Sequence, residues 1–459
     1  MTTDHRDAID FAHEPVGRLF RRMLLPTLIG MLSIVVLNLT DGAFIGHGAG
    51  SEALAGVNIA APIFNILAAI ALMFGVGCSV VASIHLSRGK RKAANINVTQ
   101  ALIGSVLLAM VVSVLILTHL GDTCRLFGSN ERLVPLASSY LRWIALAEPL
   151  ITLDIVGRFL VRLDGSPRFA SACAVVASGL NIVLDYLFIF PLGWGLEGAA
   201  IATSISFSLT ALAQMAYLVW WPRTFRLYRL RLTRKSLWLT LRNLGYQVRM
   251  GASAMLGEMA ICGSTVVGNF VFIRYLGEDG VAAYGVACYC LPVIYMMASA
   301  IVQSAQPIVS FAYGAAHGVR LRESRRLMLR WATAAGAALS LAMWWGAPLI
   351  TRLFLPTSAP AYALSAAGLP YYALSILPVT LCVVLIGYMQ SVEQAARATI
   401  YTLLRGFVII VPAFLLLPPL IGTLGIWLAP AVAETLTLLI MAAAVLWRRR
   451  VQHDKGGQF

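Results

Sequence analysis

Charged residues are scarce in this chain. They make up 12% of its 459 residues, whereas a soluble domain carries about 25%. The shortage is local, because apolar stretches of roughly 20 residues or more alternate with short polar breaks, and each is long enough to cross the hydrocarbon of a bilayer. These stretches are continuous rather than alternating, so they satisfy their backbone hydrogen bonds as helices rather than as a barrel. The sequence therefore predicts an all-α integral membrane protein.

Motifs for chemical energy and for hydrolysis are also missing. The chain has no GxxxxGK(S/T) phosphate-binding loop, no HExxH zinc motif and no GxSxG nucleophile turn. Its seven cysteines include one close pair, Cys288 and Cys290, and no second pair that could complete a tetrahedral metal site. We therefore expect no enzyme, cofactor or resident metal. An ion gradient, of H⁺ or Na⁺, is the more economical source of energy.

Basic residues outnumber acidic ones, and the net charge of +15 raises the question of a nucleic-acid partner. Their distribution argues against it: 30 of the 35 Lys and Arg residues fall in loops and termini on one side of the predicted membrane. Such asymmetry marks the cytoplasmic side. We expect a multi-pass protein of the bacterial inner membrane, with both termini cytoplasmic, a lipid bilayer around it and no nucleic-acid partner.

Both termini on one side require an even number of spans, and the apolar stretches predict twelve. The expected spans are 20–45, 53–86, 95–119, 133–158, 168–190, 196–221, 248–274, 281–313, 327–350, 361–390, 397–418 and 424–447.

The chain also repeats itself weakly at an offset of 227 residues. CRLF at 124–127 recurs as TRLF at 351–354, and Arg22-Met23 recurs as Arg249-Met250. With six helices in each half, the halves share one orientation and are related by a pseudo-two-fold axis along the membrane normal. We predict an amino-terminal six-helix lobe (1–221), a basic cytoplasmic linker (222–247) and a carboxy-terminal six-helix lobe (248–459). Transporters built from repeats place substrate between them.

Acidic residues inside the spans are the most informative side chains, because a carboxylate at the bilayer centre costs at least about 2.5 kcal/mol. Asp41 lies 19 residues beyond Arg22, and Asp185 lies 17 beyond Arg168, so both reach the outer half of the membrane. The other candidates are Glu148, Asp154, Glu258 and Glu434.

Two of these acids each have a carboxamide on the same helix face. Asn38 lies three residues before Asp41, and Asn181 lies four before Asp185. Two carboxylates at one depth could form a proton or sodium site. Glu148 and Glu258, nearer the middle of the membrane, could attract a cationic substrate.

Three further residues have simpler interpretations. Asp154 lies one turn before Arg158, which predicts an ion pair within one helix. Glu434 has no partner that the sequence identifies. Pro26 interrupts the first span early, where it could let the helix bend during transport.

The order of these residues resembles the multidrug and toxic compound extrusion (MATE) family, in its prokaryotic MepA-like or DinF-like branch. The likeness rests on Pro26 followed by Asn38-x-x-Asp41-x-x-Phe44-Ile45-Gly46 and, most specifically, on NIVLDYLFIFPLGWGLEGAAIAT at 181–203. It continues through QSAQPIVSFAYGA at 303–315 and RGFVIIVPAFLLLP at 405–418.

The resemblance implies twelve helices in two lobes, and export of amphipathic, often cationic, compounds in exchange for H⁺ or Na⁺. Carried over by position, Asp41, Asn181, Asp185 and Thr203 would form the cation site of the amino-terminal lobe, and Pro26 would be the bending proline. A flippase for a lipid-linked oligosaccharide is the alternative within a related fold. We expect a monomer.

This sequence departs from the family pattern in its carboxy-terminal half. Glu258 is displaced by about one turn from the acid of other branches, and the span 361–390 contains no Asp or Glu. A cation site is therefore expected in the amino-terminal lobe.

Overall fold

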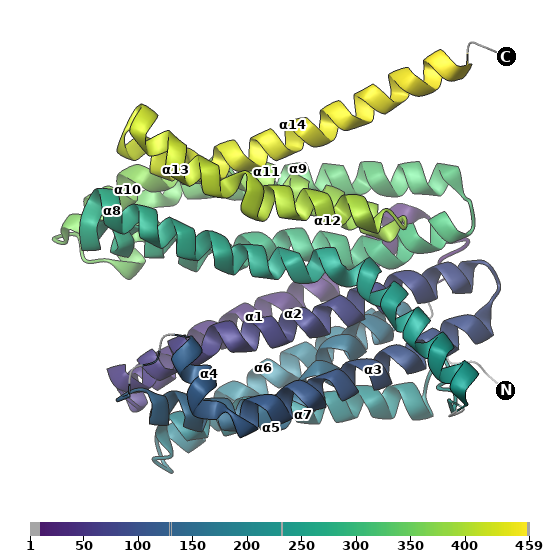
Figure 1. Cartoon of the computed structure of the whole chain (residues 1–459), viewed down its shortest axis with the longest axis horizontal. Coiled ribbons are helices and arrows are strands. Elements are labelled where there is room, and N and C mark those ends of the chain that lie inside the picture. The colour runs from purple at the N-terminus through teal and green to yellow at the C-terminus, as the bar shows by residue number, and fades with distance from the viewer. Residues whose placement is uncertain (1–9, 128, 130, 231–232, 457–459) are drawn as a thin grey trace. The chain divides into compact units, whose positions relative to one another are not determined.

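The computed structural model describes residues 10–127, 129, 131–230 and 233–456, and within these ranges it consists of helices and short connections, without strands (Figure 1). This confirms the predicted all-α fold. Residues 1–9 and 457–459, which belong to the two termini predicted to be cytoplasmic, lie outside the described residues. In chain order the elements are α1 (Val16–Gly48), α2 (Ser51–Ser87), α3 (Arg91–Thr118), α4 (Leu120–Leu126), α5 (Val134–Leu163), α6 (Pro167–Ile189), α7 (Gly195–Trp220), α8 (Arg234–Gly314), α9 (Gly318–Phe354), α10 (Pro360–Ala373), α11 (Ile376–Ser391), α12 (Ala395–Leu403), the π-helical segment η1 (Leu404–Val408), α13 (Ile410–Ile421) and α14 (Thr423–Gly456).

The described helices account for twelve membrane spans. Nine are long and apolar enough by themselves, and α10 with α11, bent by 44°, makes one more. The 81-residue helix α8 contains two spans, because Gly277 leaves the helical conformation (φ 67°, ψ −158°) between them. The remaining span is α5, which is less apolar because it carries Arg142, Glu148 and Asp154, but its 30 residues suffice to cross.

Contacts among the described residues group the chain into two compact units. Unit 1 contains the described residues up to Glu258 together with Gln303–Ser324 and Gln390–Ala395. Unit 2 contains Met259–Val302, Arg325–Met389 and the described residues from Ala396 onward. Residues 234–247, part of the predicted linker, are the first turns of α8. The lobe boundaries at 221 and 248 stay a prediction.

Unit 1 is held together by close helix pairs. Helix α1 packs on α6, α5 packs on α7, and α2 packs on α5. The buried core between α1, α5, α6 and α7 includes Leu37, Ile144, Ala177 and Ala199. These pairs bring the polar faces of α1, α5, α6 and α7 together and so position the site described below.

Two glycines let α2 and the start of α8 touch backbone to backbone within unit 1. A Cβ atom added to Gly77 would lie 2.0 Å from the carbonyl oxygen of Gln247. A Cβ atom added to Gly251 would lie 1.9 Å from the carbonyl oxygen of Met73. Small residues permit this approach, as in other membrane helix pairs.

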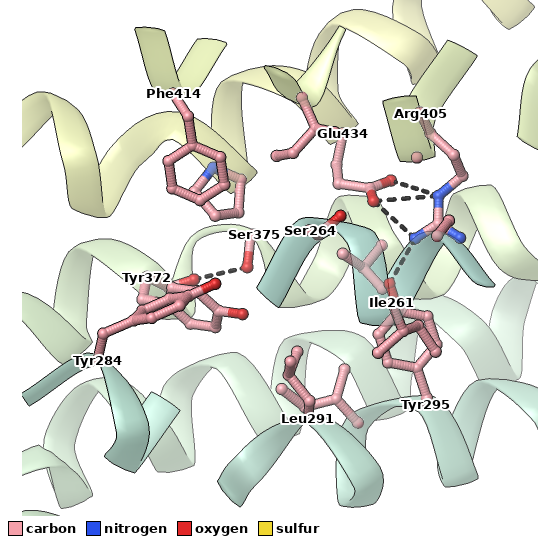
Figure 2. A pocket seen from close by; sticks show the side chains of 16 residues that line it. Ile261, Ser264, Tyr284, Leu291, Tyr295, Tyr372, Ser375, Arg405, Phe414 and Glu434 are labelled. Carbon is pink, nitrogen blue, oxygen red and sulfur yellow. Dashed lines mark hydrogen bonds and ion pairs between the residues drawn. The ribbon is translucent and has the colours of Figure 1, made fainter. Parts of the chain in front are cut away.

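Unit 2 is organised around stacked aromatic rings. Phe272 stacks on Tyr284 with ring centroids 4.3 Å apart, and Trp427 meets Phe272 edge-on at 4.8 Å. Gly368 makes room for Trp427, since a Cβ atom there would lie 2.0 Å from the indole ring. This cluster joins α8, α10 and α14 beside the pocket of Figure 2.

Candidate functional site

Asp41 of α1 and Asp185 of α6 meet inside unit 1. Their carboxyl groups lie within hydrogen-bonding reach of each other. Asp185 is fully buried, and one oxygen of each carboxyl group has no other partner among the described residues. Among these residues no Lys or Arg side chain pairs with either acid. Two carboxyl groups this close repel each other when both are ionised, so a proton or another cation at this place would stabilise the cluster.

Asn181 and Thr203 complete this cluster. The Asn181 amide is fully satisfied when its nitrogen donates to Asp185 Oδ2 at 3.0 Å and its oxygen accepts from the Thr203 hydroxyl and backbone N–H, each at 3.2 Å. Both side chains are buried. The structure thus brings together four residues that the sequence analysis singles out, Asp41, Asn181, Asp185 and Thr203. Carboxylate, amide and hydroxyl oxygens are the ligands that hard cations prefer.

Tyr140 of α5 is a fifth member that the sequence analysis misses. Its side chain is buried and lies close enough to Asp41 and Asp185 to interact with both charges. No local spacing in the sequence points to it, because it comes from a different helix. Asn38 behaves differently from the prediction of a shared face: it is exposed, and among the described residues no hydrogen bond joins it to the cluster.

A cavity of about 240 Å³ lies in unit 1 among α1, α2, α5, α6 and α8. Its lining is mostly apolar, with a few polar side chains, among them Asn65, Arg158, Arg162, Glu258 and Gln303. A small number of polar groups in an apolar cavity is typical of a site for small molecules.

The two arginines of this cavity differ in their partners. Arg158 pairs with Asp154 at 2.9 Å, which confirms the ion pair expected from their spacing. Arg162 is 5% exposed, and it donates to the neutral Gln303 Oε1 at 2.5 Å. Its Nε has no hydrogen-bond partner among the described residues. One guanidinium of the cavity thus lacks a paired acid.

The two predicted substrate acids occupy different surroundings. Glu258 lines the cavity and is exposed to it. Glu148 is buried in α5, accepts a hydrogen bond from Thr152 at 2.8 Å and does not line this cavity. Pro26 lies within α1, which runs as one helix from Val16 to Gly48. The roles assigned to these residues stay predictions.

Glu434, for which the sequence identifies no partner, is paired in unit 2. Arg405 Nε donates to both carboxylate oxygens at 3.0 Å, and an Arg405 terminal nitrogen donates to Oε1 at 2.6 Å. The two residues are 29 positions apart on different helices, so no sequence spacing could reveal the contact.

Comparison with known proteins supplies the family. The family model described as MatE matches this chain twice, over residues 26–187 and 254–415. The multidrug export protein MepA of Staphylococcus aureus (strain N315) is 22% identical over 97% of both chains. An FAD transporter of Shewanella oneidensis is 27% identical over 69% of both chains.

Solved structures of low sequence identity share the fold. The outward-facing structure of a multidrug resistance MATE transporter is 24% identical, covers 99% of this chain and 100% of that chain, and has a TM-score of 0.88. A MOP superfamily transporter from Pyrococcus furiosus is 23% identical over 98% and 99%, also at 0.88. Because the two MatE matches together cover more than half of the sequence, this chain belongs to the MATE family and is a multi-pass membrane transporter rather than an enzyme.

Proposed function

We propose that this protein is a cation-coupled antiporter that exports amphipathic, often cationic, drugs or toxic compounds by alternating access. The observation that carries the proposal is the buried contact of Asp41 with Asp185, which has no internal cation among the described residues. Two adjacent carboxylates repel each other unless a proton or Na⁺ neutralises them. Their charge state can therefore control how closely α1 and α6 pack.

The transport cycle follows from that control. An H⁺ or Na⁺ entering from outside neutralises Asp41 and Asp185, with Asn181 and Thr203 as further oxygen ligands for Na⁺. Helices α1 and α6 then pack more tightly, the cavity of unit 1 shrinks, and substrate leaves outward. After the carrier turns inward the cation dissociates, and repulsion reopens the cavity. Pro26 is the expected bending point of α1.

The available energy is sufficient for export. One positive charge moving inward supplies about 2.3 kcal/mol per 100 mV. That energy corresponds to a gradient of roughly 50-fold in a neutral solute. No cofactor beyond the coupling ion is needed. We place the transporter in the bacterial inner membrane as a monomer with both termini cytoplasmic.

Efflux from proteoliposomes with imposed gradients tests the proposal. We expect ethidium transport when either a pH gradient or a Na⁺ gradient is imposed, and none without a gradient, because the carboxyl pair needs a cation to change state. Fluorescence of vesicle-trapped ethidium measures the rate. Equal transport with and without gradients would contradict the coupling.

A second substrate class is favoured by Arg162, the cavity guanidinium without an acidic partner. It could bind a phosphate or pyrophosphate group, which both FAD, the named substrate of the Shewanella oneidensis relative, and a lipid-linked oligosaccharide carry. Arg158 is less available, because Asp154 neutralises it.

Replacing Arg162 with glutamine separates the two substrate classes. If phosphate-bearing compounds are substrates, Arg162→Gln lowers FAD transport by about tenfold or more, the loss of one charged hydrogen-bond pair. Ethidium transport should change little. Parallel assays with FAD, a lipid-linked sugar and ethidium provide the measurement, and an absence of FAD and lipid-sugar transport by the unaltered protein would discard this second class.

A further inference from the structure

Unit 2 contains a buried ion pair that the proposed cycle does not use (Figure 2). Arg405 and Glu434 share three hydrogen bonds of 2.6 to 3.0 Å, and the Arg405 guanidinium also donates to the Tyr295 hydroxyl at 2.9 Å. The side chains are 4% and 8% exposed. Both charges are thus compensated by the protein itself.

The backbone around Arg405 is specialised for this contact. Arg405 lies in the π-helical segment η1, where Ile409 N–H bonds to the carbonyl of Leu404 at 2.9 Å. Such segments are rare and are found mostly at functional positions of helices. The next residue, Gly406, allows close approach of α8, because a Cβ atom there would lie 2.2 Å from Ala260 Cβ.

The space beside the pair is too small for a drug. The cavity measures about 40 Å³ and is lined by Ser264, Ser375, Tyr284 and Tyr372 in addition to the pair. Figure 2 shows the two tyrosines across the pocket from Arg405. A volume of this size holds about one water molecule. In this state the space beside the pair does not hold a drug-sized molecule.

The repeat relates this pair to the carboxyl cluster of unit 1. The second family match begins 228 residues after the first, close to the offset of 227 seen in the short repeated strings. Helices α6 and α7 of the first repeat thus correspond to α12–η1–α13 and α14 of the second. At these offsets Asn181 corresponds to position 408 or 409, and Thr203 to 430 or 431.

Arg405 and Glu434 lie one turn away from these positions, in a consistent direction. Arg405 precedes the equivalent of Asn181 by three or four residues, and Glu434 follows the equivalent of Thr203 by three or four. The two helices of each pair are consecutive and run in opposite directions, so both displacements point toward the same end of the helix pair. The Arg405–Glu434 contact therefore lies about one helical turn from the place where the repeat would put the equivalent of the Asn181–Thr203 contact.

The carboxyl cluster of unit 1 and the Arg405–Glu434 pair of unit 2 differ in the charges of their side chains. The cluster of unit 1 has two carboxyl groups, Asp41 and Asp185, and among the described residues no basic side chain pairs with either of them. In unit 2 the position equivalent to Asp41 is Gly268 or Asn269, and the position equivalent to Asp185 is Pro412 or Ala413, so neither carboxylate has a counterpart there. The buried carboxylate of this place is Glu434, and Arg405 neutralises it. A buried charge needs a partner, and here the partner is covalently part of the chain.

We propose that Arg405 is a built-in cation: its guanidinium neutralises the buried Glu434 carboxylate of unit 2, as an exchangeable H⁺ or Na⁺ neutralises the carboxyl cluster of unit 1, so unit 2 exchanges no ion. This inference rests on the proposed function for its comparison with unit 1. The pairing of Arg405 with Glu434 stands independently of it. The consequence is that coupling ions enter one unit of the transporter and not the other.

Removing the guanidinium tests the proposal. In Arg405→Gln, Glu434 is left buried without a partner, and it should take up one proton or one Na⁺ per molecule at neutral pH. Infrared spectra of the purified protein detect the added protonated carboxyl group, and radioactive Na⁺ binding detects the alternative. The double variant Arg405→Gln/Glu434→Gln should lose the added ion.

The decisive controls use variants that keep the unit neutral. Arg405→Met/Glu434→Met replaces the pair with apolar side chains, a change that buried pairs often tolerate. It should bind as many exchangeable ions as the unaltered protein. One ion fewer in this variant, or no added ion in Arg405→Gln, would overturn the proposal. Asp41→Asn/Asp185→Asn examines the other unit: an unchanged ion count there would refute the proposed coupling site and the comparison with it, whereas the ion uptake of Arg405→Gln tests the neutralisation of Glu434 separately.

Discussion

We expect asparagine at position 41 or 185 to abolish ion-driven efflux. The substitution keeps the shape of each side chain but removes the charge that a coupling cation neutralises, so the cluster no longer changes state. For a neutral substrate at 100 mV, the loss of one coupled charge removes about 2.3 kcal/mol, or roughly a 50-fold gradient. Exchange of one H⁺ or Na⁺ for the monovalent cation ethidium is electroneutral, so the imposed ion gradient itself drives the assay. Ethidium efflux by Asp41→Asn and Asp185→Asn proteoliposomes under an imposed gradient measures the effect.

Two controls separate coupling from folding and from substrate binding. Asp122→Asn removes an acid whose side chain is 74% exposed, and it should transport normally. Equilibrium binding of ethidium to Asp41→Asn and Asp185→Asn should persist, because neither residue lines the cavity of unit 1. Full driven efflux in both asparagine variants would refute the coupling assignment.

Alanine at Gly77 or Gly251 prevents stable folding of unit 1. The added methyl group would lie about 2 Å from a backbone carbonyl oxygen of the facing helix, and no rotamer change can relieve that overlap. Forcing the two helices apart costs about 3 kcal/mol or more, the upper range for overpacked cores. Thermal stability in detergent and the yield of monodisperse protein measure the loss.

A matched glycine on the same helix provides the comparison. Gly245 lies in α8 with no atom within 4 Å of an added Cβ. Gly245→Ala should therefore be as stable as the unaltered protein or more stable, by up to about 1 kcal/mol, since alanine favours helix over glycine. If Gly251→Ala matched Gly245→Ala in stability, the backbone contact would not constrain the fold.

Hydropathy and local spacing predicted most of the fold. Each of the twelve predicted stretches overlaps an observed helix or bent helix pair, because a span is determined by its own length and composition. The Asp154–Arg158 pair was predictable for a similar reason, as both residues lie on one helix. The break between the expected spans 248–274 and 281–313 takes the form of a kink at Gly277 within α8 rather than a longer loop.

Contacts between distant helices could not be derived from spacing. Tyr140 joins the carboxyl cluster from α5, and Arg405 reaches Glu434 across 29 residues. Both contacts depend on how helices rotate and pack, which local periodicity does not determine. Depth and helix-face spacing singled out Asp41, Asn181 and Asp185, and the family resemblance added Thr203, because a family carries information about packing that one sequence lacks.

Burial of the Arg405–Glu434 pair also determines how the two repeats respond to dissolved salt. Ionic screening weakens exposed charge pairs strongly, but it hardly reaches side chains that are 4% and 8% exposed. Raising the ionic strength of the medium therefore leaves the electrostatics of the second repeat almost unchanged. Screening by salt should therefore act mainly on the exposed charges of this protein.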